Sequence, residues 1–258
     1  MTTLIKASAI LAAFICSTTH AREEETPVQH ELQSFSVKTG ATRLIYATNA
    51  QGVSLTVMNP QSYPMLVQSD VIGEDRKTKA PFIVTPPLFR LDGHQQSRIR
   101  VIATSNHDSD KKESLYWLCL TGIPPEPDAD WTDASDKKQQ AGHSATLLTQ
   151  LRIKSCLKMF IRPSDLKGSP EDFASQLTWE TTGNKLTVNN PTPFFMNLKR
   201  VLLGKQSVFS LNYVPPMGTL ELSLPAGAQG PVHWQLITDY GGDSKEFTSE
   251  LKAIRPAR

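Results

Sequence analysis

Short segments in which apolar and polar residues alternate, separated by turn residues, run through most of this 258-residue chain. Such alternation is typical of β-strands with one buried face, whereas an amphipathic helix repeats its apolar residues about every 3.6 positions. No stretch keeps the helical period over three clean turns. The segments in the first half include Arg43–Tyr46, Val53–Val57, Met65–Gln68 and Arg98–Ile102. The sequence therefore predicts an all-β fold.

The same pattern begins again after Arg162-Pro163. The predicted strands of this second half are Gln176–Trp179, Lys185–Val188, Phe194–Asn197, Ser207–Leu211, Thr219–Ser223 and Val232–Ile237. Each half has about the size of one immunoglobulin-like sandwich, roughly 100 residues. We predict two immunoglobulin-like β-sandwich domains, residues 22–162 and 163–258.

Residues 1–21 have the features of a secretory signal peptide. Lys6 precedes the apolar run Ala7–Ile15, and the small residues Thr19 and Ala21 stand at positions −3 and −1 of a cut. The run is roughly half of the ~20 residues that a membrane anchor needs. Cys16 offers lipidation as an alternative, but the residues before it lack the small side chains of a lipoprotein signal. We expect export, cleavage after Ala21 and no membrane insertion of the mature chain.

Export leaves two cysteines, Cys119 and Cys156, in an oxidising compartment. A single disulfide is the economical interpretation, and two unpaired thiols are the alternative. By chain entropy, a bridge closing this loop stabilises the fold by roughly 4 kcal/mol.

The stretch from Glu113 to Arg162 is the most unusual part of the chain. A strand over Glu113–Leu120 is followed by a polar insert that ends near Gly142, and loops of this length are usually functional or disordered. The next segment, Ala145–Ile161, is predicted as one very long strand, with seven apolar residues among its nine odd-numbered positions. It either packs in its own core or, as an exposed edge, is covered by another polypeptide.

Other functional classes find little support. The histidines at 20, 30, 94, 107, 143 and 233 show no metalloprotease spacing, and no nucleophile-elbow, Walker or dinucleotide motif is present. We therefore expect no enzyme activity, cofactor or metal, and a formal net charge of +2 does not suggest nucleic acid as the partner. A carbohydrate-binding module or adhesin remains an alternative, with Trp131 as its candidate contact. A fibre subunit would need a donor extension at its own amino terminus. This class is disfavoured because the largely acidic segment Arg22–Thr26 lacks an apolar alternation.

Seven motifs, in order along the mature chain, closely resemble the periplasmic pilus chaperones of the PapD type. They are Ala41–Tyr46, Thr85–Leu91, Glu113–Trp117, Gly122–Pro125, Lys158–Pro163, Asn190–Phe195 and Asp239–Gly242. The cysteine pair and the enlarged loop further resemble the long-loop subfamily. The resemblance implies two immunoglobulin-like domains at an angle, a fimbrial or adhesin subunit as client, an outer-membrane usher as second partner, and donor-strand complementation as the binding mode.

The resemblance also assigns roles to individual residues. The donor strand comprises Ala145, Leu147, Thr149, Leu151 and Ile153, and Thr149 departs from the bulky apolar residue usual in such a row. Arg43 and Lys158 take the positions of the pair that grips the C-terminal carboxylate of the client. Glu113, Arg162 and Asp239 resemble the charged trio that fixes the angle between the domains. Residues 22–38 form a long amino-terminal arm in which Gln33–Val37 could add an edge strand. Free molecules could also dimerise by covering each other's donor strands.

Overall fold

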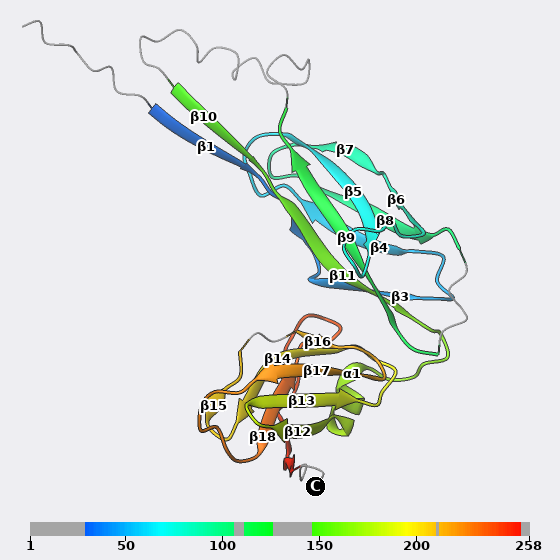
Figure 1. Ribbon diagram of the computed structural model, residues 1–258. Coiled ribbons are helices and arrows are strands. Elements are labelled where there is room, and N and C mark those ends of the chain that lie inside the picture. Colours follow the sequence, from blue (N-terminus) through cyan, green and yellow to red (C-terminus); the bar gives the residue numbers. More distant parts are fainter. Residues whose placement is uncertain (1–28, 106–110, 126–145, 210–211, 254–258) are drawn as a thin grey trace, which may run out of the picture.

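The computed structural model describes residues 29–105, 111–125, 146–209 and 212–253, which form two β-sandwiches set at an angle to each other (Figure 1). The predicted signal peptide, Trp131 and Ala145 lie outside the described residues. Each of the sandwich sheets takes its strands from one half of the chain, and the predicted boundary at Arg162 falls at the end of a strand. The predicted all-β, two-domain fold is confirmed.

The amino-terminal sandwich packs a four-stranded sheet against a five-stranded one around a core that includes Val57, Val67, Leu118 and Met159. The first sheet has the order β2 (Lys38–Thr39), β4 (Val53–Met58), β8 (Gln96–Ala103), β6 (Phe82–Thr85). The second has the order β3 (Arg43–Ala47), β11 (Lys154–Arg162), β9 (Ser114–Ile123), β5 (Met65–Gly73), β7 (Leu88–Leu91).

The carboxy-terminal sandwich encloses Trp179 and Trp234, whose rings lie 5.3 Å apart between centroids. One sheet has the order β17 (Gly218–Ser223), β13 (Lys185–Asn190), β12 (Thr178–Thr182), β20 (Lys252–Ala253). The other has the order β15 (Gln206–Ser207), β14 (Met196–Leu203), β18 (Val232–Leu236), β19 (Phe247–Ser249), and β16 (Tyr213–Val214) pairs with β14.

The start of the strand predicted over Gln176–Trp179 was wrong, because a helix, α1 (Pro170–Phe173), and a 3₁₀ turn, η2 (Ala174–Gln176), occupy the chain up to Gln176. The start of α1 carries a local signal, since Pro170 occupies the first helical position and the backbone N–H of Ser169 donates to Asp172 Oδ2 at 2.8 Å. Strand β12 begins only at Thr178.

The single long strand predicted over Ala145–Ile161 was also wrong. The described part divides at Ile153 into β10 (Thr146–Arg152) and β11. In β11 the odd-numbered residues Leu157 and Met159 enter the sandwich core, as predicted. In β10, by contrast, Leu147 and Leu151 are 53% and 45% exposed, so this half of the segment does not pack in its own core.

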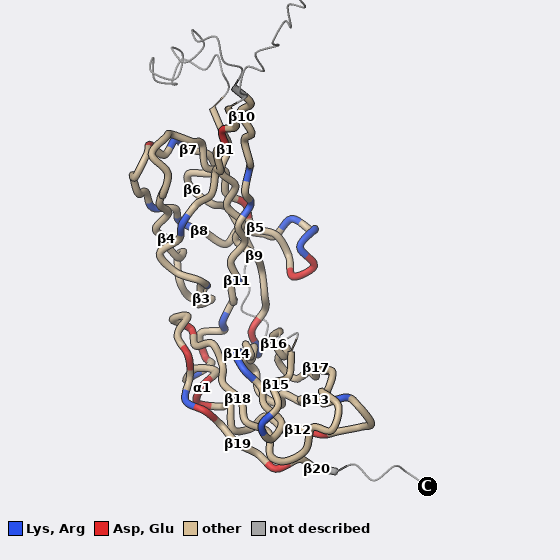
Figure 2. The backbone as a smooth tube through the Cα atoms, turned by 90° about the vertical axis from the view of Figure 1, so that its left-hand side faces the viewer, with Lys and Arg blue, Asp and Glu red and all other residues tan. Residues whose placement is uncertain are grey.

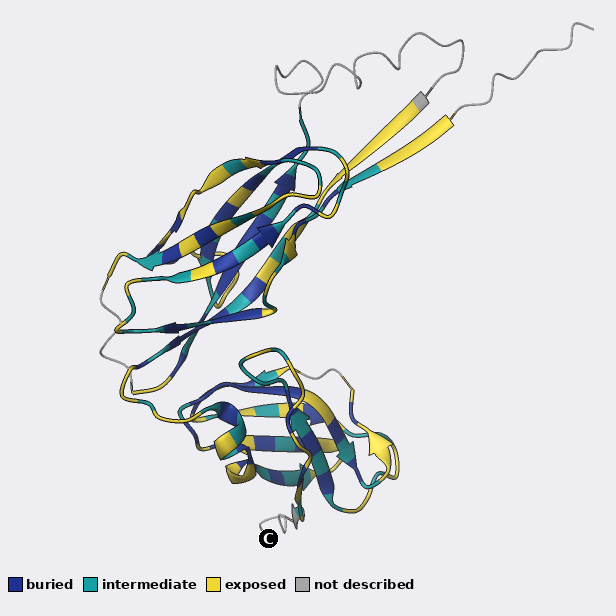
Figure 3. Ribbon diagram, turned by 180° about the vertical axis from the view of Figure 1, so that it is seen from behind, coloured by how far each residue is buried: buried dark blue, intermediate teal, exposed yellow. Residues whose placement is uncertain are grey.

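Strand β10 has a partner from the amino-terminal arm. Strand β1 (Gln29–Phe35) pairs with it in parallel over its whole length, from Gln29 opposite Thr146 to Phe35 opposite Arg152. The predicted arm strand therefore exists, but it begins earlier and ends before Val37. The two strands leave the sandwich together as a ribbon, which we call the β1–β10 ribbon (Figure 1), and its described residues away from the base are exposed (Figure 3).

The base of the ribbon is held where the arm crosses Gly122. The carbonyl oxygen of Phe35 accepts a hydrogen bond from the N–H of Ile153, whose own carbonyl accepts one from the N–H of Gly122, both at 3.2 Å. A Cβ on residue 122 would come within 2.2 Å of the Phe35 oxygen. Only glycine allows this close approach without moving the arm.

Gly122→Ala is therefore expected to push Phe35 away, break its bond to Ile153 and destabilise the amino-terminal sandwich by about 1–3 kcal/mol, the usual cost of overpacking. Hydrogen exchange measured by NMR should show lost protection at the Ile153 amide. Gly242→Ala is the control, because a Cβ there meets only Thr238 Oγ1 at an ordinary 3.7 Å. Unchanged protection of Ile153 in Gly122→Ala would contradict this account of the ribbon base.

Candidate functional site

Three large side chains form a row across the outer side of the five-stranded sheet. Lys158 of β11 is in register with Arg43 of β3 and with Trp117 of β9. Residues paired in register point to the same side of a sheet, and the neighbours of Lys158 in β11, Leu157 and Met159, point to the core side. The row therefore faces away from the core, toward the second domain.

The carboxy-terminal domain supplies the groups that contact this row. Lys158 Nζ donates to Asn197 Oδ1 at 2.8 Å and lies 4.7 Å from the ring centroid of Tyr213. Arg43 Nη1 donates to the carbonyl oxygen of Ile237 at 3.3 Å. The two cations predicted from the resemblance thus lie together in a cleft between the domains. Figure 2 shows charged positions gathered where the domains meet.

Burial makes the two positive charges of this cleft costly. It is the main cause that lowers the pKa of Lys158 to about 8, and the nearby charges of Arg43 and Arg76 lower this pKa further. Burial also lowers the pKa of Arg43, whose Nε has no hydrogen-bond partner. Within the described part of the chain neither cation forms an ion pair. An incoming carboxylate would supply charge-assisted hydrogen bonds to both.

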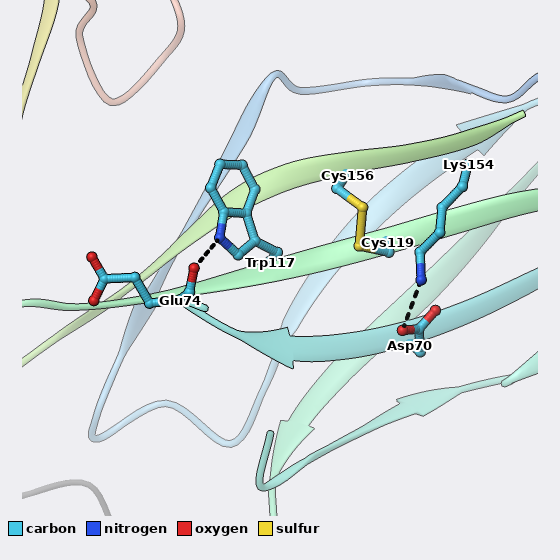
Figure 4. Close-up of a disulfide and its surroundings, with 6 residues drawn as sticks. All are labelled: Asp70, Glu74, Trp117, Cys119, Lys154 and Cys156. Carbon is cyan, nitrogen blue, oxygen red and sulfur yellow. Dashed lines mark hydrogen bonds and ion pairs between the residues drawn. A yellow bond between two sulfur atoms is a disulfide. The ribbon is translucent and has the colours of Figure 1, made fainter. Parts of the chain in front are cut away.

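A third cation is held beside the row by the turn between β5 and β6. Arg76 adopts a left-handed backbone conformation with φ of 59°, and its Cζ lies 3.9 Å from the ring centroid of Trp117. Asp75 Oδ1 orders the turn by accepting from the N–H of Lys77 and of Thr78, at 3.0 and 2.9 Å. The indole N–H of Trp117 donates to the carbonyl oxygen of Glu74 at 3.2 Å (Figure 4).

The predicted charged trio is brought together between the domains. Arg162 Nε lies 2.7 Å from Oε1 of Glu113, and its Nη1 and Nη2 donate to the two carboxylate oxygens of Asp239 at 2.7 and 3.0 Å. The second oxygen of Glu113 accepts the N–H of Phe195 at 2.8 Å. Arg162 and Glu113 come from the first domain, whereas Asp239 and Phe195 come from the second. The trio thus links the domains.

An apolar cluster covers the same junction. It joins Leu115, Trp117, Cys119 and Phe160 of the first domain to Phe195 of the second. The rings of Phe160 and Phe195 lie 5.4 Å apart between centroids. Hydrophobic packing and the trio therefore act on the same interface.

The disulfide Cys119–Cys156 crosses from β9 to β11 at residues directly opposite each other (Figure 4). The predicted pairing is present in the structure. It lies two residues along β11 from Lys158, between the cleft and the base of the β1–β10 ribbon. The bridge therefore fixes the register of the strand that connects these two features.

Comparison with known proteins identifies the arrangement. The model of the pili and flagellar-assembly chaperones, PapD N-terminal domain, matches residues 36–167, and that of the pili assembly chaperone PapD, C-terminal domain, matches residues 172–248. The chain belongs to the PapD family of pili assembly chaperones. The resemblance inferred from the sequence motifs is thereby confirmed.

Individual relatives align over nearly the whole chain. The chaperone protein AggD of Escherichia coli is 41% identical over 93% of this chain and 95% of its own length. The crystal structure of the E. coli chaperone DraB is 44% identical with a TM-score of 0.76, covering 87% of this chain and 100% of that one. A chain from the Salmonella enterica SafA pilin in complex with the SafB chaperone is 43% identical with a TM-score of 0.75, covering 86% of this chain and 99% of that one.

Among the residues that the structure describes, no helix is long and apolar enough to cross a membrane, and no group of three or more His, Cys, Asp or Glu side chains is placed to hold a metal ion.

Sequence reasoning missed the residues that complete the cleft of this chaperone. Asn197, Tyr213 and Arg76 surround Lys158, yet each stands in a segment with no motif of its own. Asn197 lies two residues beyond the quoted motif that ends at Phe195, which is a weak signal. The proximity of Asn197 and Tyr213 to Lys158 depends on the angle between the domains, and no local pattern encodes that angle. Arg76 belongs to the same domain as Lys158 and reaches it through the turn between β5 and β6.

Arg43→Ala is expected to raise the pKa of Lys158, because it removes a like charge and admits water to the cleft. The ¹³Cε resonance of Lys158, followed through a pH titration, should move from a midpoint near pH 8 in the wild type toward the ordinary lysine range. A Lys158 midpoint that stays the same would contradict the electrostatic coupling described here.

Glu113→Ala should lower the free energy of unfolding by about 3 kcal/mol, because it leaves Nε of the buried Arg162 and the N–H of Phe195 without a partner and removes one of the two carboxylates that neutralise the guanidinium. Glu221→Ala is the matched control, since its ion pair with Lys185 is more than half exposed and should contribute less than about 1 kcal/mol. Denaturant unfolding of both variants measures the difference. Equal losses would show that the trio does not stabilise the junction.

Proposed function

We propose that the mature protein works in the periplasm, where it binds a fimbrial or adhesin subunit by donating β10 and delivers it to an outer-membrane usher. The SafA–SafB structure, whose name describes a pilin in complex with a chaperone, supports a subunit as the partner. Family membership favours a chaperone over an enzyme or a carbohydrate-binding module. The observation that carries the binding mode is the exposed apolar side of β10.

The donated surface is strongly apolar and lies outside the sandwich core. Leu147 and Leu151 are about half exposed, and burying each in a subunit would contribute roughly 1.5–3 kcal/mol before ordering costs. Among the described strands β10 pairs only with β1, which leaves its other edge open to main-chain hydrogen bonds. Ile153 is only partly exposed and bonds to Phe35 at the ribbon base, which makes it the innermost residue of the donor row.

Arg43 and Lys158 would set the register of the bound subunit. A period-2 strand allows slips by two residues unless one point is fixed. A C-terminal carboxylate held between these two cations would fix the end of the subunit about 24 Å from Leu151, at roughly 3.4 Å for each step from one residue to the next along the strand. The charged trio and the disulfide would keep the cleft and the donor strand in a constant relation.

The exposed apolar residues of β10 favour aggregation when no subunit is bound, because an open apolar strand edge pairs readily with other chains. We propose that free molecules cover one another's ribbons. This pairing would be lost when a subunit binds, because both use the same face.

The test is to isolate the protein from the periplasm of its native host during fibre production and to identify by mass spectrometry what co-purifies. Leu151→Lys should reduce the captured subunit more than about tenfold, because a charge replaces a buried aliphatic chain. Leu148→Lys is the matched control, since Leu148 is similarly exposed on the opposite side of β10. Circular dichroism checks that both variants fold.

If Leu151→Lys captures as much subunit as the wild type, β10 is not the donor. If a small secreted β-protein is lost with Leu151→Lys and retained with Leu148→Lys, the donor-strand mechanism is supported and the client is identified in the same experiment.

A further inference from the structure

The apolar row of β10 has a gap in its middle. Leu147 and Leu151 are 53% and 45% exposed, but between them stands Thr149, whose side chain is shorter and carries a hydroxyl. If the groove of the subunit has a pocket at the level of Thr149, that pocket would be only partly filled, whereas Leu147 and Leu151 would fill the positions on either side of it. The gap raises the question of what fills it.

The arm strand places a leucine beside the gap. In the parallel register of the β1–β10 ribbon, Leu32 lies opposite Thr149, while His30 lies opposite Leu147 and Ser34 opposite Leu151. Adjacent strands are separated by about 4.8 Å, and residues in register point to the same side. Leu32 is 67% exposed, more than either leucine of the row. It is thus the apolar side chain of β1 on this face, at the level where β10 lacks one.

The opposite face of the ribbon is mostly polar. Gln33 Nε2 donates to Glu31 Oε1 at 2.9 Å, and Gln150 Nε2 donates to Gln33 Oε1 at 3.3 Å. The first of these bonds lies within β1 and the second joins β10 to β1. Apart from Leu148, the exposed side chains on this face are polar, so the face is suited to water. Leu32 therefore shares the apolar side with Leu147 and Leu151.

The base of β1 is fixed, which makes this register reproducible. Phe35 is 1% exposed and its ring lies 5.0 Å from that of Tyr63. The hydroxyl of Tyr63 accepts from the N–H of Ser34 at 3.0 Å and donates to its carbonyl oxygen at 2.9 Å. With Phe35 also bonded to Ile153, a slip of β1 along β10 would break all of these contacts.

We propose that Leu32 completes the subunit-binding face at the level of Thr149, so that β1 and β10 enter the groove of the subunit as one two-stranded unit. This inference rests on the proposed function, because it assigns the occupant of the face to the same fibre subunit. Continuity supports the assignment, since Leu32 adjoins the donor row on the same side of the same ribbon. Specificity then depends on two segments separated by more than a hundred residues in the sequence.

The first test exploits rescue, with the subunit that co-purifies from the native host as the probe. Leu32→Ser should weaken its capture at least about tenfold, and Leu32→Ser/Thr149→Leu should restore most of the loss by placing a leucine in the gap from the other strand. Glu31→Ser, on the polar face of β1, should change capture less than twofold. If Leu32→Ser has no effect, or if Thr149→Leu restores nothing, the proposal is overturned.

The second test asks whether β1 stays in place. Gln33→Cys/Gln150→Cys would join the two strands covalently at a register pair on the polar face, with the native disulfide checked by peptide mapping. Undiminished capture by the cross-linked protein supports a two-stranded unit. Loss of capture would show instead that β1 is a cap that must leave β10, which overturns the proposal.

Leu151→Lys separates this inference from the function on which it rests. Binding lost with Leu151→Lys but unchanged in Leu32→Ser leaves donor-strand binding intact and refutes only the role of Leu32. Binding unchanged in both variants refutes donor-strand binding itself.

Discussion

The alternation of side chains along β11 is the constraint on which both the core and the cleft depend. Its odd-numbered residues Leu157 and Met159 fill the amino-terminal core, while Cys156 and Lys158 point outward and Arg162 ends the strand between the domains. A shift by one residue would place the lysine in the core and a leucine in the cleft. Pairing on both edges, with β3 and β9, and a disulfide to β9 prevent that shift.

The cleft exists only when the two domains keep their present angle. Lys158 and Arg43 belong to the first domain, but the groups that accept their hydrogen bonds, Asn197 and Ile237, belong to the second. The bidentate contact of Arg162 with Asp239 is therefore more than a stabilising ion pair. We propose that it determines which second-domain atoms the cations face, which is the kind of geometric specificity that buried charges supply even where their net stabilisation is small.

Features that depend on one strand or on a local motif could be predicted from the sequence. Features that depend on contacts between segments far apart in the chain could not. The strands of the first domain, the cysteine pair and the members of the charged trio followed from alternation, composition and family motifs. The break at Ile153 did not, because it lies where the carbonyl of Phe35 crosses over Gly122, more than thirty residues from one partner and more than a hundred from the other. The extent of β1 was underestimated because its outer residues alternate weakly and gain their partner only from β10.

The β1–β10 ribbon gives the molecule a gradient of local stability. Its base shares the buried core through Phe35, but its outer part is a two-stranded sheet with exposed side chains, an arrangement that is only marginally stable in water. Opening of the outer part would expose little additional apolar surface, so it should fray independently of global unfolding. A binding partner must then supply the free energy that orders these residues, which lowers the net affinity but leaves the sandwich intact each time a partner binds or departs.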